Sequence, residues 1–393
     1  MAYKRWSAIS ILALMVGCNA GGGRDESTTE TAQELQVQVT PLAVTRALMP
    51  VELPFPAGVA AGSDVIFVGS PFEGRVVANS RRTGQALGDL PTPPGGFILP
   101  FIMKMVSGDR LAVLDAGGFP SPGEFVPANP VIYEYSYVYS PGGEFSAVLE
   151  RSIPFTGALV GFPEDIIQLD DGRYLLDDAV LGSIWIAETD GTISPGLVPE
   201  TFEPEDAIPE TYFCSTMPVV DVGGLPFLFT DATVPGITSM AARNGMLYFS
   251  ASCAGAIYSI PLASLSDQRE PWERAADIEL VSLKPDNVEV EELLGLTFNP
   301  YAPDDGYLYA ADALQLRVIR IDPTTGARDV VADDPRLLNF PSSLAFVPPN
   351  GPGAPSPLLA LSNQQHRTVV LKDAITEDVL EPPFLVTTIS LRR

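Results

Sequence analysis

Histidine, cysteine and basic residues are scarce in this chain, which has one His, three Cys, and 23 Lys and Arg against 49 Asp and Glu. The net charge of −26 argues against nucleic acid, because phosphate binding needs a basic face, and against electrostatic attachment to anionic lipid. It suits a soluble monomer with cationic partners or a divalent metal. No C-x-x-C pair, H-E-x-x-H or Gly-rich phosphate loop is present, so zinc and nucleotide sites have no support.

The single histidine, His366, lies in the stretch SNQQHRTVV. A catalytic triad needs its histidine in a pocket beside a nucleophile, and the sequence has no G-x-S-x-G elbow to supply one. Because apolar strand-like runs flank this stretch, we expect His366 in a turn on the rim of the fold, without a catalytic role.

Long apolar runs are also few, and one of them begins the chain. Lys4 and Arg5 precede the apolar run 6–16, which is too short to cross a bilayer and is typical of a cleaved export signal. The run ends in Met-Val-Gly-Cys at Cys18, which resembles the bacterial lipobox, whose cysteine becomes the lipidated first residue. An ordinary signal peptide with an incidental Cys18 is the alternative.

We expect residues 1–17 to be the signal peptide and residues 18–38 a flexible tether, because the second segment is rich in Gly, Thr, Glu and Gln. Lipid on Cys18 would place the protein in the cell envelope, attached to the membrane and facing the periplasm or the cell surface. Asn19 directly after the cysteine favours the outer membrane.

Two cysteines remain for the folded part, Cys214 and Cys253. A disulfide persists in the oxidising envelope compartment, and both residues could equally be buried free thiols, since sequence spacing does not fix Cβ geometry.

Proline and glycine are abundant, at 38 and 34 residues, which favours many short strands joined by turns. Residues 161–191, GFPEDIIQLDDGRYLLDDAVLGSIWIAETDG, hold three short apolar segments with tight polar connections, the pattern of an antiparallel meander. The same pair of apolar segments recurs at DVIFVGS–RVVANS, GDRLAVLDAG–PVIYEYSYV, NGMLYFSAS–GAIYSIPL, DGYLYAADA–RVIRIDPTTG and PLLALSN–RTVVLKD.

Six copies at irregular spacing predict an all-β fold, a six-bladed β-propeller over residues 39–393. We expect a strand near residues 48–55 to complete the last blade and close the ring. Two long insertions, Leu197 to Phe229 and Gly117 to Pro130, interrupt the copies, and loops of this length commonly carry function. A Cys214–Cys253 bridge would attach the first insertion to the fourth blade.

Residues 163–191 and 296–326 resemble the repeats of the senescence-marker-protein/gluconolactonase family, and NHL-type propellers share the same pattern. The resemblance implies a six-bladed propeller. It also implies one of two activities. Several family members are sugar-lactone hydrolases with a central divalent metal, whereas NHL-type propellers are mostly binding modules.

The family's metal is held near the axis, typically by a Glu that opens the first blade and by Asn and Asp residues that open later blades. At these positions this chain has Ala57 in the first blade and carboxylates in the third, Glu164 and Asp165, while the fifth offers Glu291 and Glu292 a few residues earlier. By this resemblance Glu164, Asp165 and Glu292 are the candidate ligands for a divalent metal such as calcium, a cofactor for which the residues give no firm support.

Most other acids and rings of the repeats have a structural interpretation. Asp170 to Gly172 is typical of a hairpin turn, and Asp177 and Asp178 end a strand where other copies also carry a polar residue. Glu164 and Asp165 could likewise bond backbone N–H groups where a loop enters a strand. The alternating tyrosines 133, 135, 137 and 139 share one strand face, and we expect them to pack on a neighbouring blade rather than form a carbohydrate platform.

From the sequence we therefore expect a lipid-anchored binding or scaffolding module for a protein or glycan partner. The alternative is a metal-dependent lactonase-like hydrolase in which Glu164 ligates the ion and Asp165 or Glu292 assists. Oxygen ligands converging on one mouth of the channel would favour the hydrolase, and a mouth lined by Ala57, Pro235 and Ser342 would favour the binding module.

Overall fold

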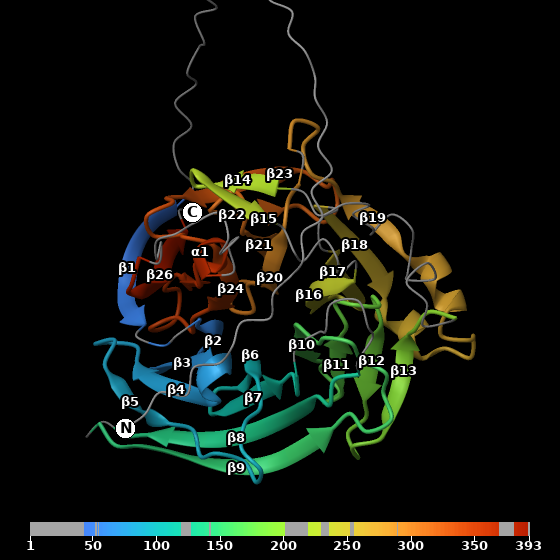
Figure 1. Ribbon diagram of the computed structural model, residues 1–393, viewed down its shortest axis with the longest axis horizontal. Coiled ribbons are helices and arrows are strands. Elements are labelled where there is room, and N and C mark those ends of the chain that lie inside the picture. Colours follow the sequence, from blue (N-terminus) through green and yellow to red (C-terminus); the bar gives the residue numbers. More distant parts are fainter. Residues whose placement is uncertain are drawn as a thin grey trace, which may run out of the picture. The chain divides into compact units, whose positions relative to one another are not determined.

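The computed structural model describes residues 43–51, 53, 55–118, 127–140, 143–200, 219–228, 236–251, 255–288, 290–368 and 381–391. Six four-stranded antiparallel sheets stand around a central axis, each with one strand at the axis (Figure 1). The all-β, six-bladed propeller is thereby confirmed. The predicted signal and tether, and Cys18, Cys214 and Cys253, lie outside the described residues.

Each blade is numbered from its inner strand outward. Blade one contains β2 (Ala57–Ala61), β3 (Val65–Ser70), β4 (Arg75–Ser80) and β5 (Ala86–Asp89); blade two contains β6 (Pro100–Ser107), β7 (Arg110–Asp115), β8 (Val131–Tyr139) and β9 (Phe145–Pro154). Blade three contains β10 (Ile166–Gln168), β11 (Tyr174–Asp177), β12 (Ile184–Ala187) and β13 (Ile193–Leu197); blade four contains β16 (Ile237–Arg243), β17 (Met246–Ala251), β18 (Ala256–Pro261) and β19 (Glu279–Ser282).

Blade five contains β20 (Leu293–Phe298), β21 (Leu308–Asp312), β22 (Arg317–Ile321) and β23 (Arg328–Asp333); blade six contains β24 (Pro341–Phe346), β25 (Leu358–Ser362), β26 (Phe384–Leu391) and β1 (Ala43–Val51). The described helical turns are short: η1 (Pro71–Glu73), η5 (Leu262–Ser266), η6 (Glu273–Asp277) and α1 (Gln365–Thr368). Within the residues that the structure describes, no helix has the length and apolarity needed to cross a bilayer.

Strand β1, from the start of the described chain, is the outer strand of the last blade. It pairs antiparallel with β26, from Ala43 opposite Leu391 to Val51 opposite Phe384. The expected closure near residues 48–55 is confirmed, although the strand begins and ends a few residues earlier. Closure joins the two ends of the fold in one sheet, because β1 from the start of the described chain pairs with β26 from its end.

The blades stack through apolar side chains because each short sheet buries both faces against its neighbours. Tyr133, Tyr135 and Tyr137 on β8 pack with Phe67 and Val65 of blade one, and all are buried. The Tyr135 hydroxyl donates to the Pro91 carbonyl oxygen at 2.8 Å, so its polar end is satisfied. The predicted packing of these rings on a neighbouring blade is confirmed.

Blade six corrects one prediction. The stretch RTVVLKD was expected to pair with PLLALSN, but Gln365–Thr368 is helical as α1 and the strand that pairs with β25 is β26. Both faces of β26 are buried: Val386 packs in the cluster shared with blade one, and Ile389 packs in the cluster shared with blade five.

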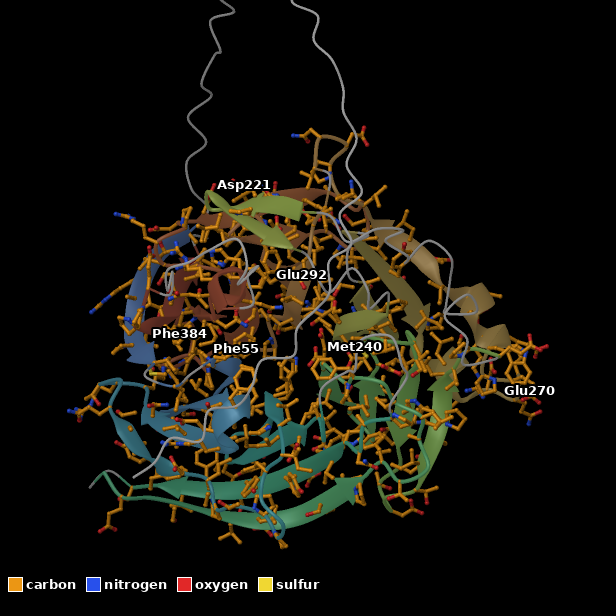
Figure 2. All side chains as sticks on the ribbon, in the orientation of Figure 1. Phe55, Asp221, Met240, Glu270, Glu292 and Phe384 are labelled. Atoms are coloured by element: carbon orange, nitrogen blue, oxygen red, sulfur yellow. The ribbon has the colours of Figure 1, made fainter. Side chains whose placement is uncertain are left out.

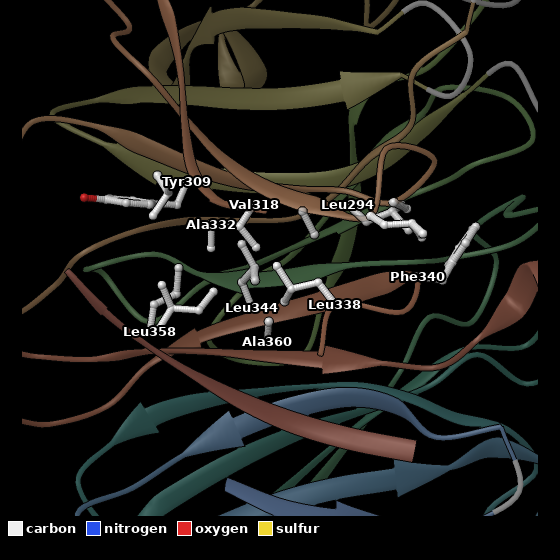
Figure 3. Close-up of a cluster of buried hydrophobic side chains, with 14 of the residues drawn as sticks. Leu294, Tyr309, Val318, Ala332, Leu338, Phe340, Leu344, Leu358 and Ala360 are labelled. Atoms are coloured by element: carbon white, nitrogen blue, oxygen red, sulfur yellow. The ribbon is translucent and has the colours of Figure 1, made fainter. Parts of the chain in front are cut away.

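A two-stranded hairpin, β14 (Val219–Val222) and β15 (Leu225–Leu228), comes from the insertion between blades three and four. It lies away from those blades, because Val222 and Phe227 join the apolar cluster between blades five and six. Figure 3 shows this cluster, which includes Tyr309, Leu338 and Phe340. The rings of Phe227 and Phe340 meet edge to face at 5.8 Å. An insertion from one side of the ring therefore packs on the other.

Candidate functional site

The inner strands bring an ion pair to the axis, with a buried carboxylate and a partly exposed lysine. Asp165 directly precedes β10, and its side chain is 3% exposed. The ammonium of Lys104, in the middle of β6, lies 2.8 Å from Asp165 Oδ1, which also accepts a hydrogen bond from the Ile166 N–H at 2.8 Å. A buried carboxylate needs a cation or several donors, and Asp165 has both.

The second oxygen of Asp165 extends the network to two further blades. The Ser239 hydroxyl donates to Oδ2 at 3.0 Å, and the Met240 N–H donates to the same oxygen at 2.9 Å. Ser239 Oγ in turn accepts from the Leu296 N–H of β20 at 2.8 Å. One carboxylate thus links the inner strands of blades two to five through side chains, where no backbone ladder joins neighbouring blades.

A second cross-link joins blades one and six, because the Val59 N–H donates to Ser343 Oγ at 3.0 Å. Met240 and Glu292 lie toward the axis, whereas Asp221 and Glu270 lie at the periphery (Figure 2). We call Lys104, Asp165 and Ser239 the axial network.

The acids that end the second strands fasten the loops leading into the inner strands. Asp178 accepts from the Gly161 and Phe162 N–H groups at 3.0 Å, and Asp115 accepts from Ile98 and Leu99, at the same sequence offsets, at 2.7 Å. Their structural role is as predicted for these repeat positions.

Asp177 holds the start of blade three in the same way. Its Oδ1 accepts from the Glu164 N–H at 2.8 Å and the Asp165 N–H at 2.7 Å. Burial, and then the neighbouring Asp165 carboxylate, raise the pKa of Asp177 well above its usual range. The predicted turn of Asp170 to Gly172 is also confirmed, with Gly172 at φ +90° and its N–H on the Leu169 carbonyl oxygen.

A second buried acid group lies where β20 begins. Glu291 and Glu292 immediately precede this strand, closer than the sequence suggested, and both are buried. Glu291 pairs with Arg328, and Asp312 accepts from Arg317 Nε at 2.7 Å. Burial and the nearby Glu291 raise the pKa of Asp312 to about 7, against the opposing effect of Arg317. The arginines make this group a structural ion cluster.

The three predicted metal ligands all lie where inner strands begin. Asp165 has both oxygens engaged by Lys104, Ile166, Ser239 and Met240. Across the described part of the chain, no group of three or more His, Cys, Asp or Glu side chains could hold a metal ion. Asp165 therefore has no oxygen left for a hard cation, which needs several converging oxygens. Metal binding by Glu164, Asp165 and Glu292 stays a prediction.

Three residues were expected to line the channel mouth of a binding module. Ala57 opens β2 and Ser342 is the second residue of β24, and Pro235 lies outside the described residues.

His366 corrects the expectation of a rim position. Its side chain is fully buried, and its ring stacks on Phe340 with centroids 5.5 Å apart and planes 13° from parallel. Neither ring nitrogen has a hydrogen-bond partner among the described residues. Burial, together with the charge of Arg367, lowers the pKa of His366 to about 4. His366 lies in the short helix α1, and its imidazole faces the protein interior rather than solvent.

A cavity of about 520 Å³ lies at the opposite mouth, where inner strands end. Parts of β2, β6, β20 and β24 line it, together with the turns that follow them, and Lys104 reaches from this cavity toward Asp165. Among the described residues that line it, Lys104 is the only charged one. Its volume falls in the usual range of small-molecule pockets, roughly 300–1,000 Å³.

Sequence reasoning missed Lys104 and Ser239. The available signal was a charged residue inside an apolar inner strand, PFIMKMVS, where a lysine needs a buried partner. The sequence alone did not identify Asp165 as that partner, because the two residues are brought together only by the stacking of adjacent blades.

Comparisons with known proteins show the fold. No family model matches the chain, and no curated protein matches it. The solved structure of a luciferin-regenerating enzyme is similar, with a TM-score of 0.51 and 13% identity over 88% of this chain and 95% of that one. Two other similar structures are a calcium-binding protein, regucalcin, from Agrobacterium tumefaciens (TM-score 0.49, 14% identity, 89% and 96% covered) and a gluconolactonase from Xanthomonas campestris (0.46, 12%, 90% and 91%).

Proposed function

We propose that the protein is a non-catalytic binding or scaffolding module of the cell envelope, favouring the outer membrane. In this proposal a lipid on Cys18 anchors the chain, residues 18–38 form the tether, and the propeller binds a protein or glycan partner. The insertions that would contact such a partner, within 117–130 and 197–229, lie largely outside the described residues. The support for the proposal therefore comes from the residues at the axis of the ring.

The observation that carries the proposal is the pairing of Asp165 with Lys104 at 2.8 Å. A divalent ion at this point would have to displace or repel the ammonium, since like charges at such short range are strongly unfavourable. Ser239 and Met240 already occupy the other carboxylate oxygen. The axial carboxylate thus supports the ring, which favours a binding module over a metal-dependent hydrolase.

A thermal melt of the full chain with calcium, with manganese and with chelator tests the proposal. A ligand that binds only the folded state raises the melting temperature by mass action. We expect equal melting temperatures under the three conditions. A rise of several degrees that is lost in Glu164→Gln would contradict the proposal and favour the lactonase-like hydrolase, which a screen of sugar lactones would then test.

A further inference from the structure

The cavity at the end of the inner strands is built on the rigid part of the fold. Ala61 ends β2, Ser107 ends β6 and Phe346 ends β24, and all three residues line it. Sites on strands hold their geometry better than sites on loops, because the backbone of a strand is fixed by its ladder. The cavity is therefore a feature of the ring itself.

Its electrostatics differ from those of the whole chain. The chain has 49 acids and a net charge of −26, yet no Asp or Glu is among the described residues that line this cavity. The remaining polar side chains there are hydroxyls, including Thr297 and Tyr301, and most of the wall is apolar, including Met105, Leu344 and Phe346. An anion entering this cavity meets the ammonium of an ion pair, and the carboxylate of that pair, Asp165, is not among the lining residues.

The cation is held in place from behind. An ammonium has three N–H donors, and among the described residues Lys104 has one partner, Asp165 Oδ1 at 2.8 Å. Asp165 is itself fixed by Ser239 and Met240 of β16, so the ammonium position is determined by residues of two other blades. The Lys104 side chain is 26% exposed, which leaves it within reach of a molecule in the cavity.

We propose that this cavity binds a small organic monoanion, a carboxylate on an apolar body, with the Lys104 ammonium as its anchor. The inference rests on the proposed binding function and deepens it by naming a ligand class. A carboxylate needs one or two donors and the apolar wall accepts its body. A phosphate dianion calls for more donors or a guanidinium fork, and the described wall has neither.

Calorimetric titration of the full chain with 4-phenylbutyrate tests this site. We expect binding of the acid, and at least tenfold weaker binding of 4-phenylbutanamide and 4-phenylbutylamine, which carry the same apolar body without the anion. Lys104→Met should lower the affinity for 4-phenylbutyrate by about tenfold or more, as expected for the loss of a charge-assisted hydrogen bond. The matched control is Lys284→Met, because Lys284 lies in the loop after β19, outside the cavity, and should leave affinity unchanged.

Lys104→Met leaves Asp165 buried without its cation, so the double variant Lys104→Met/Asp165→Asn removes both charges together. It should lose acid binding, and a thermal melt checks its fold, because either orientation of the new amide puts an NH2 group against the Ile166 or Met240 N–H. Ala345→Phe, which fills the cavity without touching the pair, should also abolish binding. The site is refuted if wild type fails to bind the acid at millimolar concentration, or if acid and amide bind equally. A metal-dependent melting shift would overturn the proposed function and leave this site standing, whereas loss of acid binding alone would remove only the site.

Discussion

The ion pair of Lys104 and Asp165 has different consequences for each of its two residues. Asp165 uses four hydrogen-bond or ionic contacts, which is about the number of acceptor positions a carboxylate offers. Lys104 uses one of its three donors. The acid is therefore satisfied and the base is only partly so, and the chemistry still available at the axis is that of a hydrogen-bond donor.

The sequence singled out Asp165 but assigned it to a metal by resemblance. Residue type and position were sufficient to predict that the acid opens an inner strand. They were insufficient to predict its partner, because Lys104 is 61 positions away and reaches it only through the contact of β6 with β10. Pairing across blades depends on tertiary geometry, which periodicity within a blade does not encode.

His366 predicts a pH dependence of stability. Its pKa is about 4 in the folded chain and 6.5 in the unfolded one, so between these values the unfolded state takes up a proton that the folded state refuses. The contribution of His366 to the free energy of unfolding is therefore fully present above pH 6.5 and is lost as the pH falls toward 4. We expect His366→Phe to remove this part of the acid sensitivity, about 3 kcal/mol for a shift of this size.

Urea unfolding of wild type and His366→Phe at pH 4.5, 5.5, 6.5 and 7.5 checks the prediction, as the difference in unfolding free energy between the two proteins at each pH. That difference should move in favour of the variant as the pH falls. Two curves that stay parallel across the whole range would show that the ring is protonated as easily in the folded chain as in the unfolded one.

At the scale of elements, local pattern predicted strands well and their partners less well. The alternation in the repeats predicted second and third strands such as β21 and β22, because tight turns make neighbours in sequence neighbours in the sheet. It failed in blade six, where residues 363–383 separate β25 from β26 and the nearer apolar stretch was taken as the partner. It also gave no position for the β14–β15 hairpin, whose contacts are with distant blades.

The hairpin should detach without unfolding the ring. Phe227 is fully buried against Phe340. Truncating a buried Phe to Ala typically costs about 3–5 kcal/mol of stability, here the stability with which the hairpin is held on the ring. An isolated two-stranded hairpin is marginally stable, so Phe227→Ala should release β14 and β15 while the six blades remain folded. We expect faster limited proteolysis within residues 197–236 and a nearly unchanged melting temperature.

Asp221→Asn is the control for that variant, because Asp221 is exposed in the same hairpin and its carboxylate accepts only from the Gly224 N–H among the bonds described. Its cleavage pattern should match wild type. A large drop in melting temperature for Phe227→Ala, with no change in proteolysis, would mean that the hairpin is an integral part of the ring.

For the whole molecule, repetition made the architecture predictable. A single meander is compatible with many β folds, whereas six related meanders favour radial repetition, which buries sheet faces against neighbouring blades and leaves only short edges. Function had no such redundancy. The proposed anion site depends on a single residue, Lys104, and one fold can host different activities, so the architecture alone does not identify the chemistry.

Ring closure predicts that stability depends on the first described strand. Met49 on β1 is 2% exposed and packs in the cluster that joins blade six to blade one. Met49→Ala should lower the unfolding free energy by about 2–5 kcal/mol, the usual cost of truncating a buried Met. Arg46→Ala on the exposed side of β1 should change it by less than about 0.5 kcal/mol. Because β1 holds the two ends of the ring together, we expect one cooperative urea transition at a lower midpoint for Met49→Ala. A biphasic transition, with one phase at the wild-type midpoint, would instead show that blade six unfolds separately and that the other five blades do not need closure.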